Sequence, residues 1–194
     1  QIPVLAPHVN YSAVDFDIEA MPDGKRGIRF GMGAIKNAGV GALQFIIDER
    51  NAHGQFASLA DFCHRVDLRQ VGKRTVESLI KVGAFGDDWG ARDDLLYAAE
   101  RIVGFSADHH KALEVGQMSL FGEATGMGEA QINIPEAPQR QKVTRRLQLG
   151  WEKELMGLYV SGRPVDNHKD KFEAMGNTSI VADLKDPEIP RPSE

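Results

Sequence analysis

The chain has 194 residues, of which 42% are hydrophobic and 26% charged, and its formal net charge is −5. This composition is typical of a globular protein of one or two domains. A single cysteine, Cys63, excludes a disulfide framework and a cysteine-rich zinc site, and it suits the reducing cytoplasm. No apolar run is long enough to span a membrane and no export signal is present, so we expect a cytoplasmic protein without a membrane partner.

Charge is unevenly distributed along the chain. Residues 1–24 carry four acids and no bases, whereas residues 25–85 carry ten bases against five acids. The remaining residues, 86–194, carry thirteen bases and nineteen acids. The middle segment is therefore basic inside an acidic chain, which favours a phosphate-rich partner. The chain also begins with Gln1 and not Met, so we expect a segment of a longer protein.

The first third of the chain predicts a small β-hairpin followed by helices. Strands are expected at 16–18 and 28–30 around a turn at 22–24, with 2–5 as an additional strand. The pattern then becomes helical. A short helical turn is expected at 34–37, a connection at 38–41, and a second helix that presents Leu43, Ile46, Ile47 and Arg50 on one face and ends at 51–54.

Three further helices are expected downstream. Ser58 and Asp61 have the spacing of a capping box that opens one helix, and 67–71 are expected to be a connection. A helix beginning at Gly72 and closed by Gly83 follows, and then a longer helix from about Ala91. The apolar stripes of these three helices are Leu59, Phe62, Cys63 and Val66; then Val76, Leu79 and Ile80; and then Leu95, Ala98, Ala99, Ile102 and Phe105.

The last third predicts a linker and C-terminal helices. Residues 122–144 are rich in Gly, Pro and Gln and are expected to form a mobile linker. Leu147, Trp151, Leu155 and Leu158 then predict a helix that ends at 161–164, followed by a short helix over 165–175. The fold class is therefore mainly α: helix-hairpin-helix elements with a small N-terminal β-hairpin and a flexible linker to C-terminal helices.

The connection Ala38-Gly39-Val40-Gly41 resembles the turn of a helix-hairpin-helix motif. Glycine lets the backbone approach a phosphate closely, and the start of the following helix presents free N–H groups and partial positive charge. Lys36 precedes this turn and adds a cation. We expect Lys36, Gly39, Val40 and Gly41 to contact DNA, the alternative being a connection selected only for tightness.

Gly72, Lys73 and Arg74 open a later helix and are expected to be a second DNA contact of the same kind. Two cations at a helix N-terminus oppose the helix dipole, which makes physical sense if a phosphate lies beside them. Two such turns would bind duplex DNA by its backbone, independently of sequence and with strong salt dependence.

Gln117-Met118-Ser119-Leu120-Phe121 has the form of a short linear binding motif. It offers one amide and two adjacent apolar anchors, and Gly116 and Gly122 flank it. It resembles the bacterial sliding-clamp-binding pentapeptide. We find no catalytic constellation and no metal site in the sequence.

Six blocks in a fixed order resemble the bacterial replicative DNA polymerase III alpha-subunit family over essentially the whole chain. The blocks are Val9 to Ser12, Ile28 to Asn37, Phe56 to Cys63, Leu79 to Phe85, Gln117 to Phe121 and Glu152 to Pro164. Six ordered blocks are much more specific than any one of them.

The resemblance implies a division of the chain into four parts. Residues 1–25 would end the fingers domain, 26–115 would form the tandem helix-hairpin-helix DNA-binding region, 116–144 would hold the clamp-binding motif and linker, and 145–194 would lead towards an OB domain. The implied partners are double-stranded DNA, the sliding clamp (beta subunit) and other replicase subunits.

The resemblance also implies where the chemistry lies. The family's catalytic aspartates and its Mg²⁺ belong to a palm domain outside this chain, so catalytic residues and cofactors are expected to be absent here, while the whole protein would be a DNA-directed DNA polymerase. The family usually has Asn at position 72 and His at position 163, where this chain has Gly72 and Arg163. Alternatives are the error-prone paralogue of this polymerase and a non-enzymatic helix-hairpin-helix protein that binds clamp or DNA.

Overall fold

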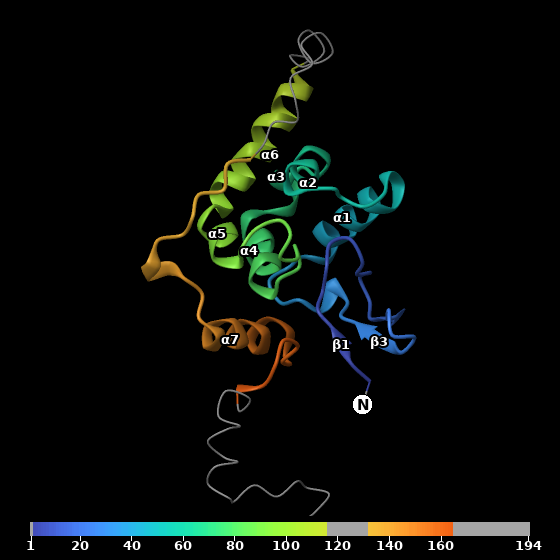
Figure 1. The fold of residues 1–194 in the computed structure, drawn as a ribbon. Coiled ribbons are helices and arrows are strands. Elements are labelled where there is room, and N and C mark those ends of the chain that lie inside the picture. The colour runs from blue at the N-terminus through green and yellow to red at the C-terminus, as the bar shows by residue number, and fades with distance from the viewer. Residues whose placement is uncertain (1, 116–131, 165–194) are drawn as a thin grey trace, which may run out of the picture. The chain divides into compact units, whose positions relative to one another are not determined.

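The computed structural model describes residues 2–115 and 132–164, drawn as a ribbon in Figure 1. The described residues up to Ser161 belong to one compact unit. They are mostly helical with a small sheet at the N-terminus, as predicted. Within the part that the structure describes, no helix has the length and hydropathy needed to cross a membrane.

The N-terminal sheet has three strands in the order β1-β3-β2. β2 (Asp17–Ala20) and β3 (Arg26–Arg29) form the predicted antiparallel hairpin, while β1 (Val4–Leu5) is the predicted additional strand and pairs with β3 in parallel. The Arg29 guanidinium donates to the Glu19 carboxylate on the neighbouring strand at 2.7 and 2.8 Å. This ion pair fixes the end of the hairpin that leads into the helices.

A 3₁₀ turn, η1 (Met32–Ala34), connects the sheet to α1 (Val40–His53). Leu43, Ile46 and Ile47 of α1 are buried, which confirms the predicted apolar face. The next helix, α2 (Leu59–Arg65), begins as predicted, since the Ser58 hydroxyl accepts from the Asp61 N–H at 3.1 Å.

Residues 67–71, predicted to be a connection, contain a short helix, α3 (Leu68–Val71). The Asp67 carboxylate caps it by accepting from the Arg69 N–H at 3.0 Å, and Leu68 and Val71 are buried. Arg69 also donates to the carboxylate of Glu114, the last residue of a later helix, α6 (Ala99–Glu114), at 2.6 Å. The prediction was wrong here because a single helical turn is too short to show a helical period.

Asp67 makes stability depend on pH in the acid range. Hydrogen bonds from the Arg69 guanidinium lower the pKa of the buried Asp67 carboxyl from 3.8 to about 2. A lowered pKa stabilises the fold above the unfolded-state pKa, and this contribution is lost as the pH falls through the folded-state value. We expect the difference in free energy of unfolding between the parent and Asp67→Asn to shrink between pH 4 and pH 2 in urea titrations. A pH-independent difference would contradict this.

α4 (Lys73–Val82) begins after Gly72 and ends at Gly83 in the left-handed conformation, as predicted. The predicted long helix from Ala91 is instead two helices, α5 (Arg92–Tyr97) and α6 (Ala99–Glu114), with Ala98 between them. The break was not predicted because the apolar stripe continues through it: Leu95, Ala98, Ala99 and Ile102 are all buried.

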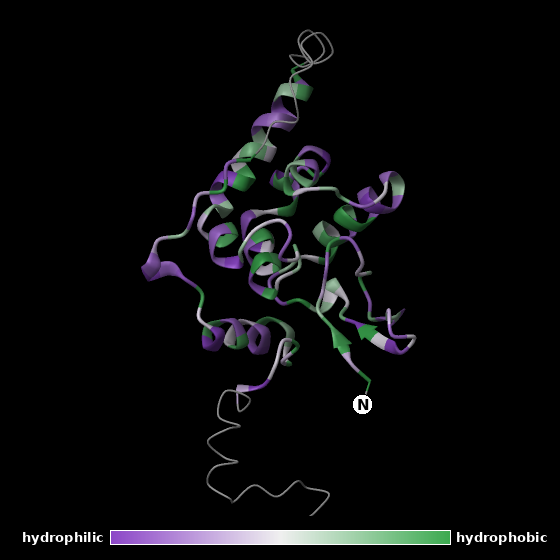
Figure 2. Ribbon diagram, viewed as in Figure 1, coloured by the Kyte–Doolittle hydropathy of each residue, from purple (hydrophilic) through white to green (hydrophobic). Residues whose placement is uncertain are grey.

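The core lies between these helices and contains a cluster of aromatic rings. Phe62 is fully buried, and its ring centre lies 5.0 Å from Phe56, 5.2 Å from Phe85 and 6.0 Å from Trp89. Figure 2 shows hydrophobic and hydrophilic residues alternating around the helices, as expected for helices that bury one face. The cluster joins α2 to the segment that follows α4.

Residues 132–144 are extended, apart from a 3₁₀ turn, η3 (Gln139–Gln141). Ile132 and Ile134 pack against the core. The Ala137 N–H donates to the Asp94 carboxylate at 2.7 Å, and the Lys142 ammonium lies 3.3 Å from the same carboxylate. This part of the predicted linker is therefore held by contacts and differs from the mobile chain that its composition predicts.

The last helix, α7 (Arg145–Met156), is shorter than predicted. Gly157 ends it in the left-handed conformation, and the chain then turns back so that the Val160 and Ser161 N–H groups donate to the buried Glu152 carboxylate at 2.8 and 3.0 Å. Leu147, predicted to be on the apolar face, is exposed, while Leu149 and Leu155 are buried. The predicted helix over 165–175 lies outside the described residues.

Candidate nucleic-acid interface

The two predicted DNA-binding turns come together through one hydrogen bond. The Arg74 guanidinium, in the first turn of α4, donates from Nη2 to Oδ1 of Asn37 at 2.7 Å. Asn37 lies immediately before Ala38 and Gly39, which lead into α1. The first turn of α4 is therefore connected to the segment that leads into α1, although more than thirty residues separate them in the sequence.

The first turns of α1 and α4 carry no acidic residue of their own. Neither helix receives a capping hydrogen bond from an N-cap side chain. The first N–H groups of a helix have no partner within the helix and carry partial positive charge. Each of these helix starts can therefore accept a phosphate.

The glycines of the first turn have no internal reason to be glycine. A Cβ added to Gly39 or Gly41 would meet no atom within 4 Å, and the backbone of Gly39, at φ −69°, suits any residue. Gly41 lies within α1, where glycine is disfavoured relative to alanine. Close approach of an external partner would explain why both positions are glycine.

Gly72 differs from these two glycines. Its φ is +84° and its ψ is 140°, a conformation that nearly requires glycine, so backbone geometry alone accounts for this residue. An added Cβ would meet open space here too. Gly72 therefore belongs to the turn through its backbone angles, and a contact with DNA remains a prediction.

The cations of the basic segment divide into paired and unpaired groups. Arg29, Arg65 and Arg69 each bind a carboxylate, at 2.7, 3.0 and 2.6 Å, and Lys73 lies 3.5 Å from Glu100. Among the residues that the structure describes, neither Lys36 nor Arg74 forms an ion pair, and both are exposed. Lys36 and Arg74 thus offer unpaired positive charge near the two helix starts, and Arg26, on β3, is another exposed cation without an ion pair in the described residues.

Val40 stands between the two glycines at the start of α1. Its side chain is 55% exposed, unusually high for a valine in a folded unit. It presents an apolar surface between two glycines at which an added Cβ would meet no atom within 4 Å. The Arg74–Asn37 hydrogen bond thus connects the first turn of α4, which holds Lys73 and Arg74, to the segment between Lys36 and Gly41. Asn37, which links the two groups, was not among the predicted site residues; a turn asparagine two residues before Gly39 was the available signal.

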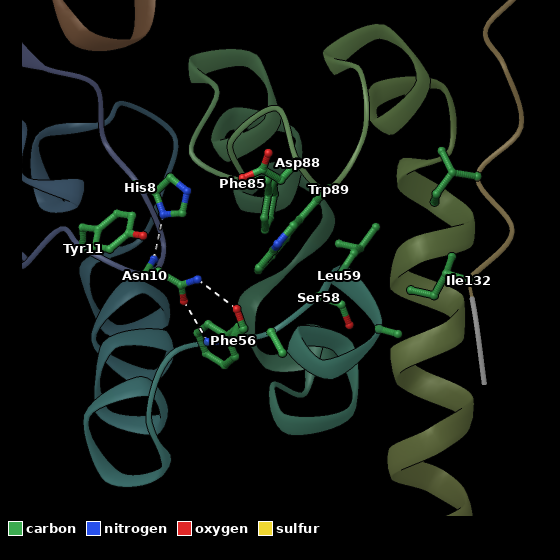
Figure 3. Close-up of a pocket in the computed structure, with 13 residues that line it drawn as sticks. His8, Asn10, Tyr11, Phe56, Ser58, Leu59, Phe85, Asp88, Trp89 and Ile132 are labelled. Carbon is green, nitrogen blue, oxygen red and sulfur yellow. Dashed lines mark hydrogen bonds between the residues drawn. The ribbon is translucent and has the colours of Figure 1, made fainter. Parts of the chain in front are cut away.

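A separate pocket of about 680 Å³ lies beside the aromatic cluster (Figure 3). The Asn10 amide donates to the Phe56 carbonyl at 2.9 Å and accepts from the Phe56 N–H at 2.8 Å, while the Asn10 N–H donates to Nδ1 of His8 at 3.0 Å. Burial lowers the pKa of His8. These contacts fasten the N-terminal segment to the loop before α2. None of the predicted DNA-binding residues lines the pocket.

Two further predictions concern the clamp-binding residues and metal binding. The predicted clamp-binding residues, Gln117, Met118, Ser119, Leu120 and Phe121, lie outside the described residues. Over 2–115 and 132–164, no group of three or more His, Cys, Asp or Glu side chains is arranged to hold a metal ion, so no step through a metal is assigned to these residues.

The comparisons with known proteins agree on one family. Residues 1–95 match the family model described as a helix-hairpin-helix motif. The chain is 38% identical over 177 residues to the DNA polymerase III subunit alpha of Chlamydia pneumoniae, an alignment that covers 90% of the chain and 14% of that protein. These matches confirm the resemblance predicted from the six sequence blocks.

Two more relatives of the same name show similar values. Identity is 37% over 164 residues with the protein of Thermus aquaticus, which covers 84% of the chain and 12% of the relative. It is 32% over 196 aligned positions with that of Mycobacterium tuberculosis strain H37Rv, which covers 100% of the chain and 16% of the relative. The chain thus spans about one seventh of the length of these curated relatives.

Proposed function

Because the chain belongs to the DNA polymerase III alpha-subunit family, we propose that it is the duplex-DNA- and sliding-clamp-binding region of a replicative polymerase. The whole protein would extend DNA primers from deoxynucleoside triphosphates in the cytoplasm, as a DNA-directed DNA polymerase. Its catalytic carboxylates and Mg²⁺ would lie in a palm domain outside this chain. The names of the relatives favour this proposal over a non-enzymatic scaffold protein.

The DNA-binding part of the proposal is supported by one observation, the Arg74–Asn37 hydrogen bond that connects the first turn of α4 to the segment before α1. Lys36, Lys73 and Arg74 would bind phosphates of the newly made duplex, and the open backbone at Gly39 and Gly41 would allow close approach. No base-reading geometry is required. Binding should therefore be independent of sequence and sensitive to salt.

Removing two of these cations tests the DNA-binding proposal. We expect Lys36→Ala combined with Lys73→Ala to weaken binding to a short mixed-sequence duplex by about tenfold at low salt. The slope of log K against log salt concentration should fall in magnitude by about 2, because a variant with two fewer phosphate contacts releases fewer counterions from the DNA when it binds. Fluorescence anisotropy at several salt concentrations measures both quantities.

A matched control removes a cation elsewhere. Lys111 is exposed on α6, towards the end of the helix that projects away from α1 and α4 in Figure 1. Lys111→Ala should leave the affinity and the salt slope almost unchanged. If the double variant and this control behaved alike, the proposed interface would be wrong.

The clamp-binding part of the proposal rests on sequence. Leu120 and Phe121 would fill an apolar pocket of the clamp and Gln117 would offer its amide to the polar rim. Attachment to a ring around DNA raises the effective concentration of the polymerase at the primer end. A modest affinity of this region for the duplex would then be sufficient for processive synthesis within a multi-subunit replicase.

A further inference from the structure

Asn37 has an unusual backbone conformation at the centre of the candidate interface. Its φ is +64°, and it is the one non-glycine residue with positive φ among residues 2–115 and 132–164. Asparagine tolerates this region better than most residues, but glycine would adopt it with less strain. The asparagine side chain therefore needs an explanation beyond the turn itself.

That side chain is directed to Arg74 on the other helix start. Its Oδ1 accepts from Nη2 of Arg74 at 2.7 Å, and both residues are exposed. A hydrogen bond between exposed groups contributes little to stability, because water satisfies either group when the bond is broken. Stability alone therefore does not account for this contact.

The partner of Arg74 is neutral, as are the partners of Arg50, whereas three other arginines of the segment bind carboxylates. Arg29, Arg65 and Arg69 are each neutralised by a carboxylate. In the described part of the chain, Arg74 has no carboxylate partner, and its side chain donates only to Asn37. An amide oxygen orients the guanidinium without cancelling its charge, and it leaves donors of the planar fork free for a phosphate.

We propose that Asn37 is a positioning residue that holds the Arg74 guanidinium between the two helix starts, so that one backbone phosphate of the duplex is bound by both turns together. This inference rests on the proposed DNA-binding function and deepens it. Asn37 contributes the orientation, Arg74 contributes the charge and the two-pronged donor, and the positive φ of Asn37 directs its amide to the neighbouring helix.

Three variants separate orientation from folding. Asn37→Gly keeps the positive φ and removes the amide, while Asn37→Asp keeps an acceptor for Arg74 but neutralises its charge. Arg74→Ala removes the cation. All are made in the full chain and compared by anisotropy on the same mixed-sequence duplex, with the free energy of unfolding measured beside the affinity.

We expect Asn37→Gly to weaken duplex binding by about threefold to tenfold with little change in unfolding. Asn37→Asp should weaken it further, since the carboxylate competes with the phosphate. The Asn37→Gly and Arg74→Ala double variant should bind no more weakly than Arg74→Ala alone, because orientation has no value without the guanidinium.

Two results would overturn the inference while leaving the proposed function intact. One is a double variant whose fold-loss of duplex affinity equals the product of the losses of Asn37→Gly and Arg74→Ala measured singly. The other is an Arg74→Ala variant that binds as tightly as the parent while the Lys36 and Lys73 double variant binds weakly. If the lysine variant also bound normally, the proposed function itself would fail, so the two failures are distinguishable.

Discussion

The variant with both Leu120→Ala and Phe121→Ala is expected to lose at least about 2 kcal/mol of binding free energy for a bacterial sliding clamp, which is about 30-fold in Kd. Large apolar anchors dominate peptide binding, since each buries its whole side chain in a preformed pocket. Titration calorimetry with purified clamp measures the change directly.

The control for this experiment removes two comparable apolar side chains from another part of the chain. Phe16 and Ile18 are 51% and 65% exposed near the N-terminal hairpin. Phe16→Ala combined with Ile18→Ala should leave clamp affinity unchanged. Equal clamp affinity of the Leu120 and Phe121 variant and the parent would refute the assignment of the pentapeptide.

The second large effect is expected in the core. Phe62→Ala should reduce the free energy of unfolding by about 3 to 5 kcal/mol, because a fully buried ring is removed from contact with Phe56, Phe85 and Trp89. Urea denaturation followed by tryptophan fluorescence measures this loss, since Trp89 reports on the same cluster.

Phe16→Ala is the matched comparison for the core variant. Its ring contacts Phe30 at 4.7 Å but is half exposed, so a markedly smaller loss is expected. Equal losses for Phe62→Ala and Phe16→Ala would contradict the buried cluster as the centre of stability.

Local signals in the sequence were enough to predict most elements of the fold. The hairpin of β2 and β3, the cap at Ser58 and the helix closed by Gly83 each have a residue type that is needed at that position. α3 was missed because its signal is a single cap, Asp67, without a period. The break at Ala98 was missed because both helices bury the same stripe.

The candidate site was predictable in its parts but not in its assembly. Glycines and cations near two helix starts indicated phosphate binding, and in the structure one hydrogen bond connects the first turn of α4 to the segment before α1. Pairings between distant residues are not visible in the sequence. The Arg69–Glu114 and Lys73–Glu100 contacts, which reduce the basic excess of residues 25–85, and the Asn37–Arg74 contact all depend on tertiary packing.

The chain on both sides of the pentapeptide is attached to the same folded unit. α6 ends at Glu114, and Ile132 and Ile134 pack against the core, while Arg101 of α6 donates to the Asn133 carbonyl at 3.3 Å. Figure 1 shows the segment after residue 131 running back beside α6. The described residues that flank 116–131 on both sides therefore belong to the same folded unit.

Sixteen residues, 116–131, connect these two segments. A fully extended chain spans at most about 3.5 Å per residue, so the middle of a sixteen-residue connection can lie no more than about 28 Å from its nearer end. If the pentapeptide binds a clamp as proposed, the length of this connection would limit how far the clamp can stand from the folded unit.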